Sequence, residues 1–255
     1  DERANSLEEQ TTMPIQDHIE MGFSGDNGDL NFNDLITKLN ATEYYPELFT
    51  LAFGTSEITE TRIQQALAQF VRSIQSFDSK YDDGRILVNN EAQSFPNFTT
   101  QENLGKTLFL QPPVFNASGS RINGGVGCAG CHQAPEFDID PNTLNNGVIG
   151  TASGTGTDFT VTRSPSLRDV IKQDGTSNGP FMHIGISNNI ATVLNHYDQI
   201  NLSGNTNLDQ RLRPNGFPQQ LNMTPAEKDA IISFIRTLAG NDVYTDEKWS
   251  NPFIN

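Results

Sequence analysis

Five consecutive residues constrain this chain more than any other feature. Residues 128–132 read Cys-Ala-Gly-Cys-His, which is the C-x-x-C-H spacing at which a c-type haem is attached. The two thiols can add across the two vinyl groups of one haem, and the imidazole of His132 then reaches the iron. Cys128 and Cys131 are the only cysteines among the 255 residues. The motif therefore predicts a covalently bound haem c with His132 as one axial ligand.

The alternatives for this cysteine pair are a disulfide or half of a zinc site. Zinc would need three or four thiolate or imidazole ligands at finger-like spacing, and the sequence has no second cysteine pair. A redox C-x-x-C pair is typical of a βαβ context, which is absent around residue 128. The haem interpretation is preferred. Because covalent haem attachment takes place outside the bacterial cytoplasm, it predicts a periplasmic or extracytoplasmic protein whose signal peptide has been removed.

The formal net charge of −15 limits the partners. It argues against nucleic acid, whose phosphates need basic partners. It favours the approach of a positively charged redox protein through long-range steering, although solubility alone would also explain it. No apolar run is long enough to span a bilayer.

Helical patterns stand at both ends of the chain. Apolar residues at helical spacing, among them Ile63, Leu67 and Phe70, predict a helix over residues 60–75 with Thr59 as its N-cap, after a shorter helix over 43–53. Residues 79–97 are polar and irregular and are predicted to be a linker.

The second half begins and ends with better-marked helices. Thr99 and Glu102 have the spacing of a capping box, and so do Thr224 and Glu227 at the final helix, which Gly240 is predicted to end at its C′ position. Gly105 on the first of these helices and Phe234 or Leu238 on the last would suit a close crossing. The long loops between them need a core, which a haem would supply.

The ligand on the other face of the iron decides the chemistry, because it sets the redox potential and the access of substrate. The candidates after the motif are Met182, His183, His196, Tyr197 and Met223. Met223 precedes the last helix and is better explained as a hydrophobic staple residue. The residues alone leave Met182, His196 and Tyr197 open.

Six further segments occur in a characteristic order around the haem motif. They read SLEEQ (6–10), PI (14–15), EM (20–21), ALAQFVR (66–72), RSPSLR (163–168) and GPFMHIG (179–185). Together with the motif, this order resembles the bacterial di-haem cytochrome c peroxidases and their MauG-type relatives over nearly the whole chain. Family members carry two haems, each with its own C-x-x-C-H. Since this chain contains one such motif, we expect a family member whose first attachment motif lies upstream of the given sequence.

The resemblance implies a mainly α fold. Residues 99–255 would form the cytochrome c domain with the covalently bound haem. Residues 1–98 would form the C-terminal part of the peroxidatic haem domain and a linker, as the helical remnant of a second cytochrome c-like domain.

The resemblance also implies roles for residues near the N-terminus. Gln10 and Glu20 resemble the polar residues of the peroxidatic pocket, and Pro14 resembles one of its walls. A carboxylate there can take a proton from bound peroxide and return it to the leaving oxygen. At the second haem, the peroxidases place a methionine where this chain has Tyr197, and MauG-type enzymes have a tyrosine. The resemblance therefore favours Tyr197 as the ligand, with Met182 next.

Two further sets of residues follow from the resemblance. Arg163 and Arg168 look like partners of the haem propionates. The family also binds calcium between its domains through main-chain carbonyls, near positions that match Asn178 and Pro180 here.

The function implied is that of a di-haem peroxidase or MauG-like oxidoreductase. It would use hydrogen peroxide as oxidant and exchange electrons with a donor protein or a partner-protein substrate, through two haems c in the intact protein and with a calcium ion. A homodimer is one expected assembly. The alternative is a mono-haem c-type electron-transfer protein.

Overall fold

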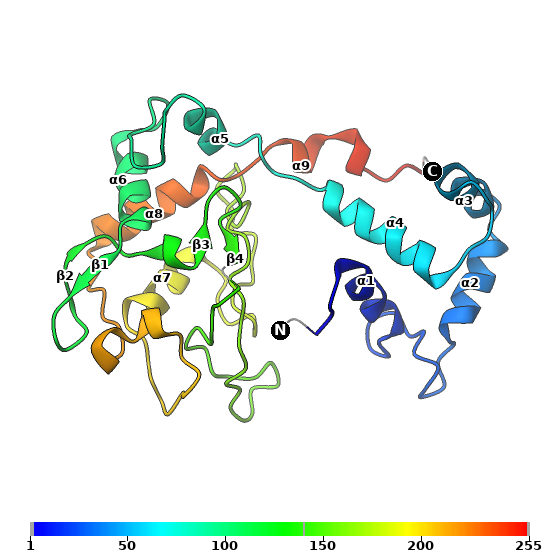
Figure 1. The fold of residues 1–255 in the computed structure, drawn as a ribbon, viewed down its shortest axis with the longest axis horizontal. Helices are drawn as coiled ribbons and strands as arrows, with labels where there is room; N and C mark the ends of the chain where they lie inside the picture. The colour runs from blue at the N-terminus through cyan, green and yellow to red at the C-terminus, as the bar shows by residue number, and fades with distance from the viewer. Residues whose placement is uncertain (1–2, 140, 254–255) are drawn as a thin grey trace. The chain divides into compact units, whose positions relative to one another are not determined.

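The computed structural model describes residues 3–139 and 141–253 and contains two compact units, the first ending at Gln75 and the second beginning at Ser76 (Figure 1). Helices dominate both units, in agreement with the predicted mainly α fold. In the described residues, strands form only two short antiparallel pairs. No helix there combines the length and the apolar character that crossing a membrane requires.

Four helices form the N-terminal unit. They are α1 (Leu7–Gln16), α2 (Phe32–Asn40), α3 (Tyr44–Phe53) and α4 (Glu60–Ser73). α1 packs against α4, and α2 packs against α3. The start of α4 is confirmed, because the Thr59 hydroxyl accepts the N–H of Arg62, and Ile58 and Ile63 are buried in one apolar cluster.

The predicted apolar stripe of α4 is only partly buried. Ile63 is in the core of the unit, whereas Leu67 is 37% exposed to solvent and Phe70 is 48% exposed. A helix buries its stripe only where another layer covers it, and the core of this unit forms around Ile15, Phe32 and Phe49 instead. The sequence pattern therefore identifies the helix but not the extent of its buried face.

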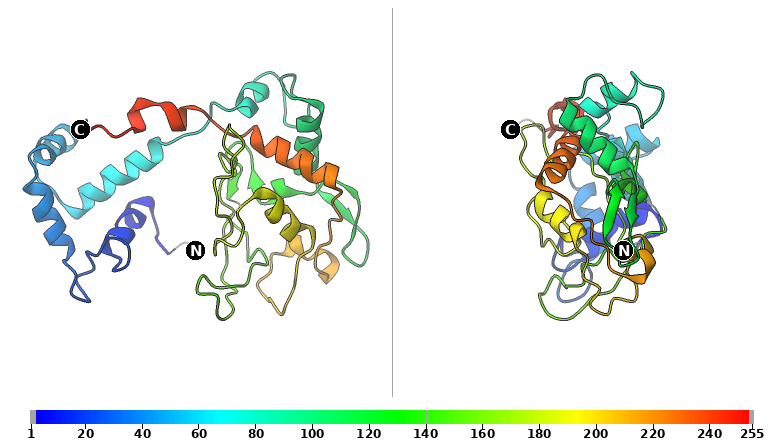
Figure 2. Two further views of the ribbon diagram at one scale, coloured as in Figure 1. Left: turned by 180° about the vertical axis from the view of Figure 1, so that it is seen from behind. Right: turned by 90° about the vertical axis from the view of Figure 1, so that its left-hand side faces the viewer.

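The C-terminal unit is built around two helices that cross each other, α6 and α8, with the loop-rich stretch drawn in green and yellow beside them (Figure 2). Its helices are α5 (Lys80–Arg85), α6 (Thr100–Leu110), α7 (Ile190–Asp198), α8 (Pro225–Arg236) and α9 (Asp242–Thr245). Its strands are β1 (Pro113–Phe115), β2 (Arg121–Gly124), β3 (His132–Gln133) and β4 (Asp138–Ile139), and its 3₁₀ turns are η1 (Cys128–Gly130), η2 (Gln210–Leu212), η3 (Pro214–Gly216) and η4 (Glu247–Trp249). β1 pairs with β2 and β3 with β4.

The close crossing of α6 and α8 depends on Gly105, as predicted. A Cβ added at Gly105 would lie 1.9 Å from the carbonyl oxygen of Ala230 and 2.9 Å from Cβ of Phe234. Both predicted capping boxes are also present, at Thr99 with Glu102 and at Thr224 with Glu227.

Residues 79–97 are not a linker, contrary to the prediction. They contain α5, and the rings of Tyr81 and Phe95 are each only 1% exposed. Tyr81 packs edge-on to Phe137 at 4.8 Å between ring centroids, in the aromatic core that also holds Phe234. The sequence of this segment shows no apolar period, because two separate aromatic side chains, Tyr81 and Phe95, attach it to the core. The compact unit thus begins before residue 99, the predicted start of the cytochrome c domain.

The prediction that Gly240 ends the last helix is wrong. α8 ends at Arg236, and Thr237 is its C-cap residue. Gly240 is needed for a close approach instead, since a Cβ there would lie 2.3 Å from the hydroxyl of Ser76 and 2.5 Å from the carboxylate of Asp78. Its N–H donates to the Asp169 carboxylate.

Candidate haem-attachment site

The C-x-x-C-H segment begins with a tight turn. Cys128–Gly130 form η1, and the N–H of Cys131 donates to the carbonyl of Cys128 at 3.1 Å. Gly127 enters the turn at φ 73°, and a Cβ there would lie 2.7 Å from the ring of Pro113. Cys128 and Cys131 are not joined by a disulfide. Burial, and next the thiol of Cys131, raise the pKa of Cys128 to about 12.

His132 is oriented by two backbone carbonyls. Its Nδ1 lies 3.0 Å from the carbonyl oxygen of Phe137 and 3.1 Å from that of Pro165. Carbonyls only accept hydrogen bonds, so Nδ1 carries the proton and the lone pair of Nε2 is left for a metal. Burial lowers the pKa of His132, against the effect of the two carbonyls, which favours the neutral ligand form. The histidine therefore has the tautomer that an axial ligand needs.

Tyr197 lies within electrostatic reach of the two thiols. It is in the last turn of α7, whose start is capped by the Asn189 side chain accepting the N–H of Thr192. Burial raises the pKa of Tyr197 to about 12, a hydrogen bond from Asn146 opposes the rise, and the nearby thiols of Cys131 and Cys128 add to it. The structure thus brings the phenol and the attachment motif together although 65 residues separate Tyr197 from His132.

Tyr197 and Met182 converge on one side chain. The amide nitrogen of Asn146 lies 3.5 Å from Oη of Tyr197 and 3.7 Å from Sδ of Met182. Met182 adopts φ 66°, a left-handed conformation that is uncommon outside glycine. Two of the three ligands that the sequence left open therefore face the same amide group.

The other candidates are less suitable as ligands. The Nε2 of His196 lies 2.9 Å from the carbonyl oxygen of Asn146, which leaves only its Nδ1 for a metal, and its contact is with the Asn146 backbone rather than with the amide that Tyr197 and Met182 share. His183 is exposed, and Met223 is buried in the core beside the start of α8, as expected for a staple residue. The set of residues that fits a c-type haem is therefore the C-x-x-C-H segment with Tyr197 or Met182.

The two arginines have protein partners. The guanidinium of Arg168 forms a bidentate pair with Asp82 at 2.8 and 2.9 Å and also donates to the carbonyl of Pro135. Arg163 donates to the carbonyl of Thr143. Arg168 therefore ties α5 to the loop that follows the motif, and the contact of either arginine with a propionate stays a prediction.

The predicted peroxidatic residues lie in the N-terminal unit. Gln10 is exposed on α1, and Pro14 is half-buried in the same helix. Glu20 is exposed in the following turn, where the carboxylate of Asp17 accepts the N–H groups of Ile19 and Glu20. Their roles remain predictions.

The predicted calcium residues are in a loop of the C-terminal unit. The N–H of Asn178 donates to the carbonyl of Val170, and the peptide bond before Pro180 is cis. Among residues 3–139 and 141–253, no group of three or more His, Cys, Asp or Glu side chains could hold a metal ion. A calcium site here would depend on main-chain carbonyls, as predicted, and stays a prediction.

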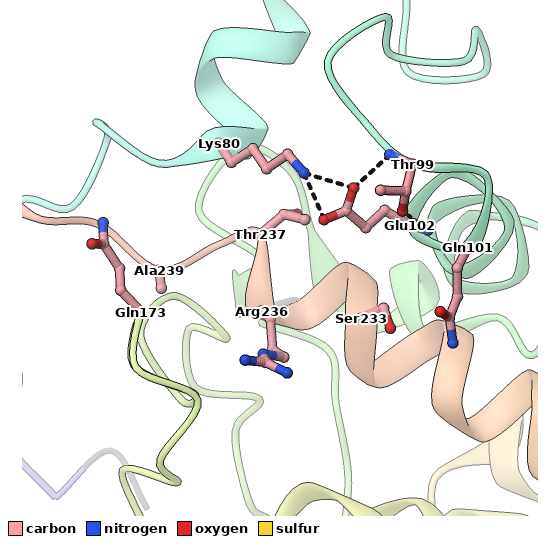
Figure 3. A pocket seen from close by; sticks show the side chains of 9 residues that line it. All are labelled: Lys80, Thr99, Gln101, Glu102, Gln173, Ser233, Arg236, Thr237 and Ala239. Atoms are coloured by element: carbon pink, nitrogen blue, oxygen red, sulfur yellow. Dashed lines mark hydrogen bonds and ion pairs between the residues drawn. The ribbon is translucent and has the colours of Figure 1, made fainter.

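Two hollows lie in the C-terminal unit. A mostly apolar hollow of about 340 Å³ has Met182 and His196 on its wall. A more polar one of about 530 Å³ lies where the start of α6 meets the end of α8, and Lys80 bridges to Glu102 at 2.7 Å within it (Figure 3). The first adjoins the candidate ligands, whereas the second contains no residue of the predicted site.

Two residues of this site carry no signal in the sequence. Asn146 contacts both candidate ligands, yet nothing distinguishes it among the many asparagines of its loop. Arg211 pairs with Asp209 and donates to the carbonyl of Gly130 inside the motif. A side chain that acts through a neighbour of the ligand leaves no local sequence signal.

Comparisons with known proteins find similarity to one group of haem proteins. A family model for di-haem cytochrome c peroxidases matches residues 1–90. The methylamine utilization protein MauG of Methylophilus methylotrophus is 28% identical over 94% of this chain and 63% of its own length. MauG of Methylorubrum extorquens is 28% identical over 93% of this chain and 59% of its own length. The cytochrome c551 peroxidase of Nitrosomonas europaea is 25% identical over 94% of this chain and 61% of its own length.

The fold is also found among solved structures. A MauG-like protein associated with microbial copper homeostasis superposes with a TM-score of 0.64 at 22% identity, covering 99% of this chain and 74% of that one. The present chain spans about 60% of the length of the three relatives that it matches in sequence.

Proposed function

We propose that this chain, which is similar to MauG and the di-haem cytochrome c peroxidases, is a member of their family, carries a covalent haem c and takes part in peroxide-dependent oxidation. The observation that carries the proposal is the convergence of three parts: the thiols of the motif, His132 in its ligand tautomer, and Tyr197 beside them. A bound haem c would supply the redox chemistry, which the protein tunes through its axial ligands.

Each residue of the proposed site has a defined task. Cys128 and Cys131 would hold the group through thioethers, and His132, whose Nδ1 is engaged with the carbonyls of Phe137 and Pro165, would bind its iron through Nε2. Tyr197 would be a second ligand of the iron, as a phenolate. An anionic oxygen donor favours oxidised iron, so this site would store oxidising equivalents rather than serve as a simple entry point for electrons.

The proton chemistry is assigned to the N-terminal unit. Glu20 would take a proton from hydrogen peroxide and return it to the leaving oxygen, and Gln10 would hydrogen-bond the same oxygen. This assignment requires a second haem c in the intact protein. The oxidised substrate would be a donor protein or a partner protein, in the periplasm or another extracytoplasmic compartment, and a calcium ion near Asn178 is part of the same proposal.

Substitution of Glu20 by Gln in the intact protein tests this function. We expect the loss of a proton shuttle to lower peroxide turnover about 100-fold or more, since general acid–base catalysis contributes about 10²–10⁴-fold. The measurement is peroxide-dependent oxidation of a reduced donor, with haem content determined for each sample. Glu43→Gln, another exposed glutamate of this unit, is the matched control.

Two outcomes would contradict the proposal. Full turnover in Glu20→Gln would remove the proton-shuttle role. A protein that carries haem but consumes no peroxide would instead support the mono-haem electron carrier.

A further inference from the structure

We propose that Asn146 is a positioning residue that selects Tyr197 over Met182 as the second axial ligand of the haem. This inference rests on the proposed haem c site and adds to it a residue that decides which of two side chains binds the iron. It is carried by the contacts of Asn146 and of the loop around it.

The orientation of the Asn146 amide follows from its hydrogen bonds. Its Oδ1 accepts the N–H of Val148 at 3.0 Å. Because an N–H can only be matched by the oxygen, the NH₂ group must be the end that faces Tyr197 and Met182. At 3.5 Å from Oη and 3.7 Å from Sδ, the same donor is within reach of both.

The loop around Asn146 is fixed from both sides. The preceding residue, Asn145, is fully buried; its N–H donates to the carbonyl of Asn207, its carbonyl accepts the N–H of Asp209, and its amide donates to the carbonyl of Thr160. These three partners come from two other stretches of the loop region, so the backbone next to Asn146 has little freedom.

The following residues fix the loop against the helix that carries Tyr197. Gly147 turns the chain at φ 88°, and a Cβ there would contact His196 and Ile200. Nε2 of His196 lies 2.9 Å from the carbonyl oxygen of Asn146. Asn146 and Tyr197 are therefore held to each other through the neighbour of Tyr197 on α7, which sets where the amide points.

An N–H donor at this place discriminates between the two ligands. A hydrogen bond to an anionic oxygen is charge-assisted and roughly twice as strong as a neutral one, whereas a thioether sulfur is a weak acceptor. The amide thus stabilises an iron-bound phenolate more than an iron-bound methionine. Groups of this kind, one contact away from the metal, orient ligands and tune the metal.

Two substitutions in the haem-loaded protein test the inference. Asn146→Leu removes the amide, and Asn146→Asp keeps an oxygen for the Val148 N–H but places an acceptor where the donor was. In both variants we expect the ferric spectrum to lose its tyrosinate character, a near-infrared methionine-to-iron charge-transfer band to appear, and the midpoint potential to shift to more positive values. A merely structural role would not move the potential in this way.

Three further variants control the experiment. Asn207→Leu removes a side-chain amide hydrogen bond to the carbonyl of Phe159 but keeps the backbone carbonyl that holds Asn145, and it should leave spectrum and potential unchanged. The double substitution Asn146→Leu with Met182→Leu should lack the methionine band, which shows that Met182 is the replacement. Tyr197→Phe should give the methionine band without any change at Asn146.

The spectra separate this inference from the proposed function, because they are recorded without peroxide. Tyrosinate ligation that persists unchanged in Asn146→Leu and Asn146→Asp overturns the role of Asn146 alone. A methionine band in the wild-type protein overturns both the Tyr197 assignment and the inference. If the protein shows the expected spectra but no peroxide turnover, the proposed function is wrong and the role of Asn146 in ligand choice is still supported.

Discussion

The side chains proposed to contact the haem iron are set in place by groups one contact further out. His132 is held by two backbone carbonyls, and Tyr197 faces the amide of Asn146. The motif itself is held by the guanidinium of Arg211 on the carbonyl of Gly130. At this scale the ligands are ordinary residues, and their chemistry depends on which donor or acceptor lies behind each of them.

Gly105 is the residue on which the packing of α6 against α8 depends. In Gly105→Ala the added Cβ would meet a backbone carbonyl at 1.9 Å, which cannot rotate away, so the two helices must separate. We expect the free energy of unfolding to fall by about 1–3 kcal/mol, as for overpacking of a core, or by more. Urea unfolding of the haem-loaded protein measures it. Gln101→Ala, exposed on the same helix, is the control, and equal stability of the two variants would contradict the close crossing.

Helix starts were predictable because their chemistry is local. The capping boxes at Thr99 with Glu102 and at Thr224 with Glu227 each need two side chains three residues apart, and both are present in the structure. The haem motif is equally local, whereas the tautomer of His132 depends in part on the carbonyl of Pro165, 33 residues away.

Features that depend on distant partners were not predictable in this way. Tyr81 enters the core through contacts with Phe137 and Phe234, which are 56 and 153 residues away in sequence, so no period in 79–97 marks it. Gly240 has a signal typical of a helix end but serves a close approach to Ser76. The convergence of Met182 and Tyr197 on Asn146 likewise exists only in the folded loop.

One of the ion pairs that attach α5 to the rest of its unit, Asp82 with Arg168, has a pH dependence that can be predicted. Burial alone would raise the pKa of Asp82, but hydrogen bonds from Arg168 and Ser79 outweigh it and hold the pKa below its usual value. A carboxylate with a lowered pKa in the folded state stabilises the protein above its unfolded-state pKa of about 3.9, and this stabilisation is lost as the pH falls through the lower folded value.

Asp82→Asn should therefore lower the free energy of unfolding at pH 7 by about 2–3 kcal/mol, since it leaves the nearly buried Arg168 guanidinium without its carboxylate. The difference from the wild-type protein should shrink as the pH falls below about 3.9. Urea titrations between pH 7 and acid pH measure both effects. Asp83→Asn, on the exposed side of α5, is the matched control, and a difference that does not depend on pH would refute the assignment to this ion pair.

Over the whole molecule the charge is strongly negative, at −15. A field of this size raises the rate at which cationic proteins arrive, and it acts before any specific contact forms. If the charge served solubility alone, the reaction with a donor would be insensitive to the sign of the donor's own charge.

The dependence of the reaction on ionic strength distinguishes these two roles. We expect kcat/KM for peroxide-dependent oxidation of a lysine-rich donor cytochrome to fall several-fold as salt is raised from about 0.01 to 0.3 M, because the screening length shrinks from about 30 Å to below 8 Å. A small neutral reductant should show no such fall, since it is not steered by the field. If the rates with both donors fall equally with salt, the acidic surface does not guide the partner. Electrostatic steering would then be refuted, even with peroxide turnover intact.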